Sequence, residues 1–290
     1  YAINPTEVLV NISRQVNVFM MFIAMGFFVY NLKSKRTFIS FVIISILSIE
    51  VYAVLNEALQ MVNTSGIING GALKGVTANR NITAFSIIIK IPFVLFLIYK
   101  NQKILYKLIL SGIIFLAILC LSMIQSRASF LALGMILLAF LGLCIVLFLG
   151  DKNKKRLFQY GYLFFPFLAA IAINQIVLSN KGADALARAS TISFETNDGS
   201  INQRLRYYED VLTHLSSNPI FGVGLGNWKL KSIDYDSKDI VGYVVPYHAH
   251  SDFIQLGAEL GIVGFLLYLG IFIWAVFFVY RIIRYSNRSV

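Results

Sequence analysis

The stretch LILSGIIFLAILCLSMIQSRASFLALGMILLAFLGLCIVLFL (residues 108–149) decides the fold class, because a helix formed from it is apolar on every side. A membrane-spanning helix needs about 20 apolar residues, and this stretch is long enough for two. Arg127 is its one charged residue, so we expect a tight turn there. Over the whole chain 58% of residues are hydrophobic and 13% are charged, whereas soluble domains carry about 25% charged residues. The sequence therefore predicts an all-α polytopic membrane protein.

The apolar stretches predict one transmembrane helix bundle over residues 1–290. Its seven expected spans are 16–32, 38–56, 82–99, 104–124, 129–149, 157–178 and 253–283. A large loop at 179–252 carries short helices. The chain begins at Tyr1 without a methionine, so we expect further spans beyond its ends.

Basic residues mark every second connection between the expected spans, which is the positive-inside pattern of cytoplasmic loops. They are Lys33, Lys35, Arg36, Lys100, Lys103, Lys107, Lys152, Lys154, Lys155, Arg156, Arg281, Arg284 and Arg288. The net charge of +11 therefore reflects topology and not a nucleic-acid partner. The other connections, which include the turn at Arg127 and the loop 179–252, are expected to face outward.

Two residue types on this outward side, arginine and histidine, could take part in substrate binding or catalysis. Arg127 is either an arginine that snorkels at a hairpin turn or a guanidinium fork that grips phosphate oxygens. His250 stands at the outer end of the last span, and histidine is the side chain best suited to proton transfer near neutral pH. A lone interfacial histidine is more often structural, but this one shares its side with Arg127 and Arg204.

The loop 179–252 is expected to contain an amphipathic helix. A capping box at Ser200 predicts its start, and Asn218, which precedes a proline, predicts its end. Arg204 lies at the edge of the apolar stripe and is expected to point inward, whereas Arg206 is expected on the solvated face. The stripe consists of Ile201, Leu205, Tyr208, Val211, Leu212 and Leu215. The glycines of 219–228 fit no nucleotide-binding spacing, so they predict a turn.

Two charged residues lie inside the expected spans. Glu50 and Lys90 fall at similar depth on neighbouring antiparallel spans. Unpaired charges are rare within membranes, so we expect these two side chains to pair. Cys120 and Cys144 lie in apolar runs, which argues against a disulfide or a metal site.

Four segments together resemble the O-antigen ligase and polymerase family. His250-Ser251 is followed after nine residues by Gly261-Ile-Val-Gly264, and the other three segments lie upstream. They are SRAS (126–129), QRLRYYEDVLTHLSSNPIFGVGLGNW (203–228) and GVTANRNITAF (75–85). Members of this family are bacterial inner-membrane enzymes that move lipid-linked glycans on the periplasmic side. This sequence departs from the pattern at Tyr208, where tryptophan is commoner, and at the alanine that follows His248.

The resemblance implies a GT-C-like glycosyltransferase with His250 as the catalytic base. It implies that Arg127 and Arg204 hold the diphosphate of a polyprenyl (undecaprenyl) diphosphate glycan donor, with Arg80 a weaker candidate for the same role. Two arginines can replace a metal ion, so no metal or other cofactor is expected. The implied partners are this donor, a glycan or lipid acceptor, and membrane lipids.

His248 and Glu259 are candidates for supporting roles near the base. The leading interpretation is a glycan ligase that uses this donor, as in the ligation of O-antigen to lipid A core in lipopolysaccharide biosynthesis. The residues leave the acceptor open. A surface polysaccharide polymerase or a protein O-oligosaccharyltransferase uses the same chemistry. The alternative from another class is a transporter with Arg127, Glu50 and Lys90 along its pathway, although the sequence lacks the internal repeats common in transporters.

Overall fold

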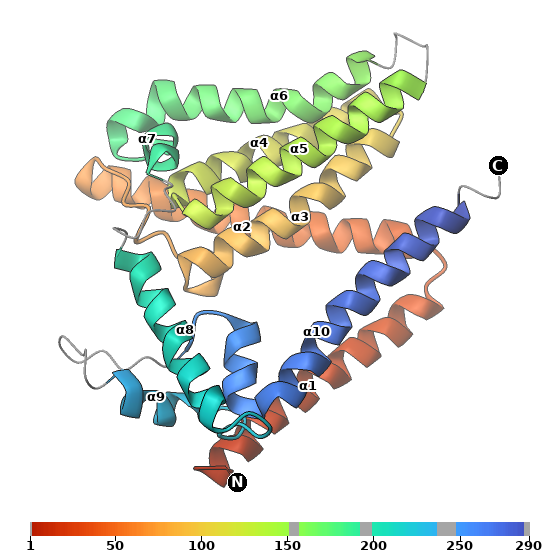
Figure 1. Ribbon diagram of the computed structural model, residues 1–290. Coiled ribbons are helices and arrows are strands. Elements are labelled where there is room, and N and C mark those ends of the chain that lie inside the picture. Colours follow the sequence, from red (N-terminus) through yellow and green to blue (C-terminus); the bar gives the residue numbers. More distant parts are fainter. Residues whose placement is uncertain (1, 151–156, 192–198, 237–247, 287–290) are drawn as a thin grey trace. The chain divides into compact units, whose positions relative to one another are not determined.

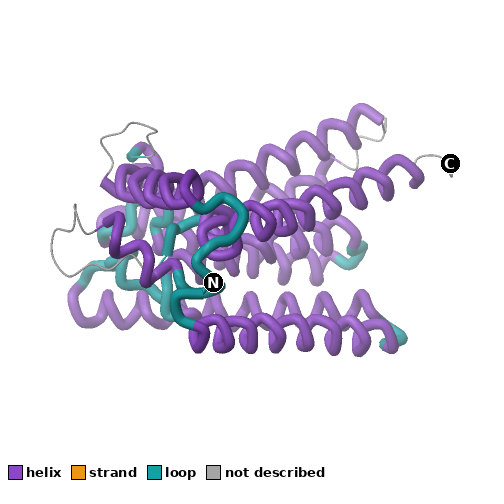
Figure 2. The backbone as a smooth tube through the Cα atoms, turned by 60° about the horizontal axis from the view of Figure 1, so that its bottom comes forward, coloured by secondary structure: helices purple, strands orange, loops and turns teal. Residues whose placement is uncertain are grey.

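The computed structural model describes residues 2–150, 157–191, 199–236 and 248–286, and these ranges contain helices, turns and loops but no strand (Figures 1 and 2). Seven of the described helices are long and apolar enough to cross a membrane. The predicted all-α polytopic membrane fold is therefore confirmed. The chain divides into two compact units: unit 1 is Tyr1–Asn31 with Phe194–Val290, and unit 2 is Leu32–Ser193.

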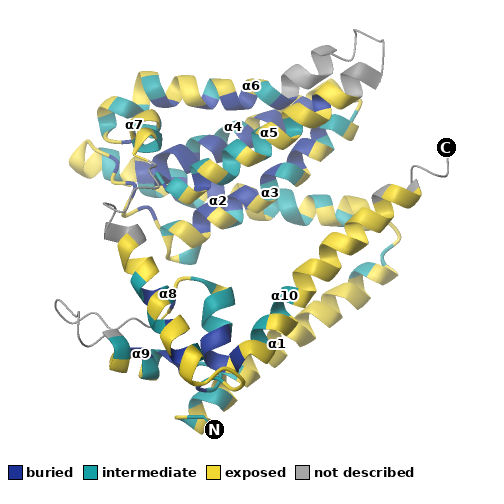
Figure 3. Ribbon diagram, viewed as in Figure 1, coloured by how far each residue is buried: buried dark blue, intermediate teal, exposed yellow. Residues whose placement is uncertain are grey.

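Unit 2 is a bundle of helices with an apolar core. Its helices are α2 (Lys35–Ser65), α3 (Arg80–Lys100), α4 (Ile104–Ile124), α5 (Arg127–Gly150), α6 (Leu157–Ile173) and the short α7 (Ala185–Ser190). α4 packs against α2, α3 and α6, and the core lies among them (Figure 3). Leu47, Ile91 and Leu121 are fully buried there. The described part of the unit also contains the helical turns η1 (Gly75–Thr77), the π-helical η3 (Asn174–Leu178) and η4 (Ser179–Lys181).

Inside this bundle the side chains of Glu50 and Lys90 pair, as the sequence predicts. Lys90 Nζ lies 2.9 Å from each carboxylate oxygen of Glu50. The Ser86 hydroxyl donates to Glu50 Oε1 at 2.6 Å, and Lys90 donates to the Ser86 carbonyl at 2.7 Å. The two charged side chains are only 11% and 6% exposed for Lys90 and Glu50, so the pair joins α2 to α3 within the bundle.

Unit 1 contains two long apolar helices and two shorter ones. They are α1 (Pro5–Asn31), α8 (Gly199–Ser217), α9 (Trp228–Asp236) and α10 (Asp252–Ser286). α1 and α10 expose most of their apolar side chains (Figure 3), as expected of helices whose solvent is lipid. A small core of Val211, Val223, Trp228, Ala249 and Ala258 holds α8, α9 and the start of α10 together.

Two helices extend beyond the apolar spans expected from the sequence. α1 begins at Pro5 and not at residue 16, and α2 continues to Ser65 and not to residue 56. Hydropathy identifies only the apolar part of a helix, whereas the backbone hydrogen bonds of the helix continue through its polar residues. α2 ends where Gly66 adopts a left-handed conformation with φ 73° and its N–H caps the Val62 carbonyl.

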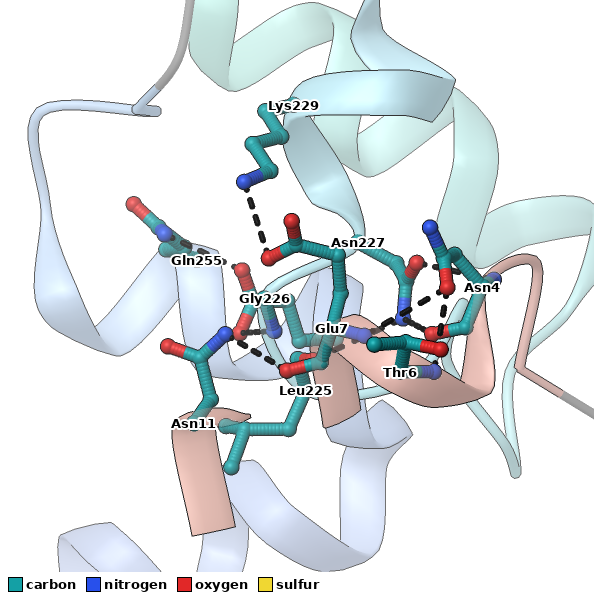
Figure 4. Close-up of polar contacts among 10 residues, drawn as sticks. Asn4, Thr6, Glu7, Asn11, Leu225, Gly226, Asn227, Lys229 and Gln255 are labelled. Carbon is teal, nitrogen blue, oxygen red and sulfur yellow. Dashed lines mark hydrogen bonds and ion pairs between the residues drawn. The ribbon is translucent and has the colours of Figure 1, made fainter. Parts of the chain in front are cut away.

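The first residues of the chain are anchored on the glycine-rich segment 219–228 of unit 1 (Figure 4). The Asn4 N–H donates to Asn227 Oδ1 at 3.0 Å, and the Asn227 amide donates back to the Asn4 carbonyl at 3.3 Å. Lys229 forms an ion pair of 2.9 Å with Glu7. α1 therefore starts well before its apolar stretch because its polar first turns have partners in this segment.

Candidate active site

His250 stands at a sharp bend two residues before α10 begins. Its φ is 56°, an uncommon left-handed conformation for a residue with a side chain. The residue is exposed, yet its ring stacks on that of Tyr207, with centroids 5.7 Å apart and planes 18° apart. The Tyr208 hydroxyl donates to the His250 carbonyl at 3.5 Å. The bend and α8 together hold the imidazole in a defined position.

The surroundings of His250 favour its neutral form. Partial burial lowers the pKa of His250 below its usual value near 6.5, and the positive charges of Arg204 and His248 lower it further. At neutral pH the imidazole therefore has a free lone pair and is ready to accept a proton. The charge of Arg204 therefore acts on the imidazole within unit 1.

The two arginines of α8 differ from the prediction in their exposure. Arg204 is exposed and not turned into the unit, whereas Arg206, predicted to be solvated, is half-buried with its guanidinium 5.5 Å from the Tyr207 ring centroid. The apolar stripe is also displaced, because Leu205 and Leu212 are exposed. The residues of α8 that pack inward are Tyr207, Val211 and His214. Aromatic side chains together with Val211 therefore form the packed face, and Arg204 lies on the exposed one.

His248 and Glu259 are connected through Gln255. Gln255 Oε1 lies 3.3 Å from His248 Nδ1, and the Gln255 amide donates to Glu259 Oε1 at 3.1 Å. The other oxygen of Glu259 accepts the Gly226 N–H at 2.8 Å, and Glu259 is only 5% exposed. The carboxylate therefore fastens the glycine-rich segment to α10, and its hydrogen bonds reach the histidine region only through Gln255.

The glycine-rich segment packs against α10 at the place where this helix is broken, Gly261. This residue has φ 70° and ψ −170°, a conformation that is essentially restricted to glycine. The carbonyls of Ala258 and Glu259 accept the N–H groups of Val223 and Gly224 at 3.0 and 2.9 Å, and the Ile262 N–H donates to the Pro219 carbonyl at 3.0 Å. A Cβ atom at Gly222 or Gly261 would overlap the facing backbone. The predicted turn is confirmed, and its hydrogen bonds satisfy the broken helix.

In unit 2, three arginines gather at the turn between α4 and α5. Arg127 is the first residue of α5, and Arg188 of α7 donates from Nε to the Gln125 carbonyl at 3.3 Å. Arg80 opens α3, and its Nη1 lies against Gly71, whose neighbour Gly70 faces the carbonyl of Met123. Burial lowers the pKa of the Arg188 guanidinium, and the charges of Arg127 and Arg80 lower it further. The three cations together suit a multiply charged anion.

A buried amide holds α7, and with it Arg188, at this place. The fully buried Asn174 donates to the Ala183 carbonyl at 2.7 Å and to the Ser122 hydroxyl at 3.0 Å, and it accepts the Ala185 N–H at 3.0 Å. Asp184 caps α7 by accepting the Ala187 N–H at 2.9 Å. Sequence reasoning missed Arg188, because nothing in ALARAS distinguishes it from a surface arginine. Its position depends on contacts with Asn174 and Gln125 that are distant along the chain.

The candidate residues are thus divided between the units. Arg204, His248, His250 and Glu259 belong to unit 1, and the arginines at 80, 127 and 188 belong to unit 2. Within the described ranges, no group of three or more histidine, cysteine or acidic side chains is arranged to hold a metal ion. The candidate residues comprise histidines and a carboxylate in unit 1 and guanidinium groups in both units.

A family model described as O-antigen ligase matches residues 112–269. This range includes Arg127, Arg188, Arg204, His250 and the break at Gly261. Neither the curated proteins nor the solved structures give a match to the chain.

Proposed function

The chain belongs to the O-antigen ligase family, and from this membership we propose that it transfers a glycan from a polyprenyl diphosphate, such as undecaprenyl diphosphate, to a hydroxyl group of an acceptor. The proposed setting is the periplasmic side of the bacterial inner membrane, as in the ligation of O-antigen to lipid A core. Its membership already makes the chain a membrane glycan transferase of the ligase or polymerase type.

The proposed reaction needs a base and a cationic site. The acceptor oxygen forms a bond to the anomeric carbon of the glycan while the bond from that carbon to the diphosphate oxygen breaks. The hydroxyl proton passes to the imidazole of His250. The polyprenyl diphosphate leaves with the electron pair of the broken bond, and fixed guanidinium groups stabilise its negative charge. No metal ion is required for this sequence of events.

The observation that carries this proposal is the state of His250. Its ring is stacked on Tyr207, and partial burial together with Arg204 keeps it neutral near pH 7. A neutral imidazole beside a guanidinium matches a reaction that takes one proton from an acceptor and leaves negative charge on a donor. We assign donor binding to Arg204, Arg127 and Arg80, and we add Arg188 because it gathers with the last two.

The transporter alternative has less support. Glu50 and Lys90 bond to one another and to Ser86, so the charges that this alternative would place along a pathway are engaged with each other within the bundle. A polymerase and a protein O-oligosaccharyltransferase share the proposed chemistry with the ligase, and they differ from it only in the acceptor.

The test is glycan transfer in reconstituted vesicles. A polyprenyl-diphosphate glycan is supplied with lipid A core, with a lipid-linked repeat unit or with a protein acceptor, each with and without a chelator. His250→Ala should abolish transfer, and Arg204→Lys, which keeps the charge but loses the fork, should weaken it. Arg281→Gln, at the other end of α10, is the matched control and should leave transfer unchanged. Full transfer by His250→Ala would refute the base, and loss of transfer with the chelator would refute the metal-free site.

A further inference from the structure

Unit 1 contains a pocket of about 490 Å³ at the end of α8, and none of the residues assigned to the proposed reaction lines it. Its wall comes from the last residues of α8, the first half of the glycine-rich segment, Lys231 of α9 and Ile3. Its volume lies in the range of about 300–1,000 Å³ that is typical of ligand sites. The chemistry of this wall indicates which ligand the pocket suits.

His214 is the buried polar residue of this pocket, with only 3% of its surface exposed. Its Nδ1 lies 3.1 Å from the Tyr235 hydroxyl, and its ring lies beside that of Trp228, with centroids 5.8 Å apart. Its Nε2 has no hydrogen-bond partner among the described residues. Because buried polar atoms are nearly always hydrogen-bonded, this nitrogen indicates that the pocket binds a ligand.

Lys231 adds a positive charge to the same pocket. Burial lowers the pKa of His214, and the charge of Lys231 lowers it further, so the imidazole is neutral at pH 7 and Nε2 donates when the Tyr235 hydroxyl donates to Nδ1. Lys231 also pairs with Asp234 at 2.7 Å, but the two side chains are 33% and 60% exposed, and such surface pairs contribute little. The ammonium is therefore available to a phosphate, which His214 can bind as well.

The end of α8 has the opposite charge preference. Ser217, the last residue of α8, and Asn218 both line the pocket. The last carbonyl groups of a helix have no partner within the helix, and they carry partial negative charge. The Asn218 N–H donates to the His214 carbonyl at 3.0 Å, whereas Pro219 has no N–H to offer. This end of the pocket therefore suits a small cation with N–H donors, such as a primary ammonium group.

The remaining wall of the pocket is apolar. Ile220 and Phe221 line it, and each exposes more than half of its surface. The Pro219 carbonyl accepts the Ile262 N–H at 3.0 Å, and Ile262 begins the uncharged part of α10 that extends to residue 280, which is nearly the length that crosses a bilayer. The two exposed side chains are therefore held at the level where α10 enters the membrane, and lipid chains suit them better than water does.

We propose that this pocket binds the head group of a phospholipid with a primary amine, such as phosphatidylethanolamine. Lys231 and His214 hold the phosphate, the end of α8 holds the ammonium, and the acyl chains leave along Ile220 and Phe221. Phosphatidylcholine has the same phosphate, but its nitrogen carries methyl groups and no N–H donor, and phosphatidylglycerol has no cation. The pocket should therefore prefer the amine lipid to both. None of these residues belongs to the proposed reaction, so the proposal is independent of it.

The test is photoaffinity labelling in nanodiscs of phosphatidylcholine. The probe is phosphatidylethanolamine with a diazirine in one acyl chain, close to the glycerol. It should label residues 218–223, and unlabelled phosphatidylethanolamine in place of part of the phosphatidylcholine should suppress this labelling but not the labelling of residues 272–280 of α10. Equal suppression by phosphatidylglycerol would overturn the role of the ammonium. Suppression by soluble glycerophosphoethanolamine would overturn the lipid as the ligand, and absence of label at 218–223 would overturn the site.

Variants of the pocket make the test specific. Lys231→Gln should raise about tenfold the fraction of phosphatidylethanolamine that halves the labelling, because it removes a charge-assisted hydrogen bond, whereas Lys231→Arg should keep binding, since a guanidinium also grips phosphate. His214→Phe, which keeps a ring between Tyr235 and Trp228, should raise that fraction about fivefold. Lys229→Gln, the same substitution at a residue of α9 outside this pocket, is the control, and thermal unfolding checks that each variant folds. Unchanged suppression in both Lys231→Gln and His214→Phe would overturn the proposal.

Discussion

The pair of Glu50 and Lys90 allows a quantitative prediction about stability. Lys90→Met removes the ammonium that contacts both oxygens of the Glu50 carboxylate, and it leaves that carboxylate, in a side chain 6% exposed, with the Ser86 hydroxyl. Removal of one partner of a buried ion pair costs about 3–5 kcal/mol, because the remaining charge is buried without compensation. We expect this loss in the free energy of unfolding of the single variant.

The double variant separates pairing from mere packing. Glu50→Gln with Lys90→Met removes both charges, and the replacement of a buried pair by neutral side chains is often nearly neutral. If the two positions were independent, the losses of the two single variants would add to about 6–10 kcal/mol. We expect the double variant to lose less than Lys90→Met alone.

The assay is equilibrium unfolding in mixed micelles, with an increasing fraction of denaturing detergent. Lys100→Met is the matched control, because it makes the same substitution at an exposed position near the end of the same helix. The control should change the free energy of unfolding by less than about 0.5 kcal/mol. Additive losses in the double variant would refute the coupling that the 2.9 Å contacts imply.

Three further predictions concern the candidate site and its support. Because the pKa of His250 is lowered, transfer should persist at and somewhat below pH 6.5 and fail at lower pH, where the imidazole is protonated. Arg204→Gln should let that pKa rise, so the acid limb of the log(kcat/KM) profile should move to higher pH; a limb that stays in place would contradict this. Arg188→Gln should raise the KM for the polyprenyl-diphosphate donor about tenfold, through the loss of a charge-assisted hydrogen bond, and steady-state kinetics should show an unchanged acceptor KM. Gly261→Ala should lower the free energy of unfolding by about 1–3 kcal/mol or more, because alanine is strained at φ 70°, and the mixed-micelle assay would disprove this by showing no change.

The all-α polytopic fold could be predicted from the sequence because the membrane imposes a simple requirement on length and hydropathy. The pairing of Glu50 with Lys90 is predictable for a related reason, because a charged side chain inside a membrane helix needs a partner. The polar start of α1 and the polar end of α2 could not be predicted in this way. α1 starts at Pro5 because Asn227 and Lys229 bond to its polar first turns, and hydropathy carries no information about such distant partners.

The candidate site is predictable from the sequence only in part. His250 and Arg204 stand out in the sequence because both are polar residues expected on the same side of the membrane. Their functional roles stay predictions, and the structure adds that the charge of Arg204 acts on the His250 imidazole. Arg188 does not stand out, because Asn174 and Gln125 determine its position. Helical periodicity also misplaces the packed face of α8, where Tyr207 and His214 are buried, whereas Leu205 and Leu212 are exposed.

The break in α10 makes the order in which the segments are synthesised important for folding. Val223 and Gly224 donate their N–H groups to the carbonyls of Ala258 and Glu259. The ribosome synthesises these two donor residues before it synthesises α10. Unpaired backbone groups in a bilayer cost several kcal/mol each, so the broken helix enters the membrane when its hydrogen-bond donors already exist. A circular permutation that placed α10 ahead of residues 219–224 would reverse this order and leave the break at Gly261 open during insertion.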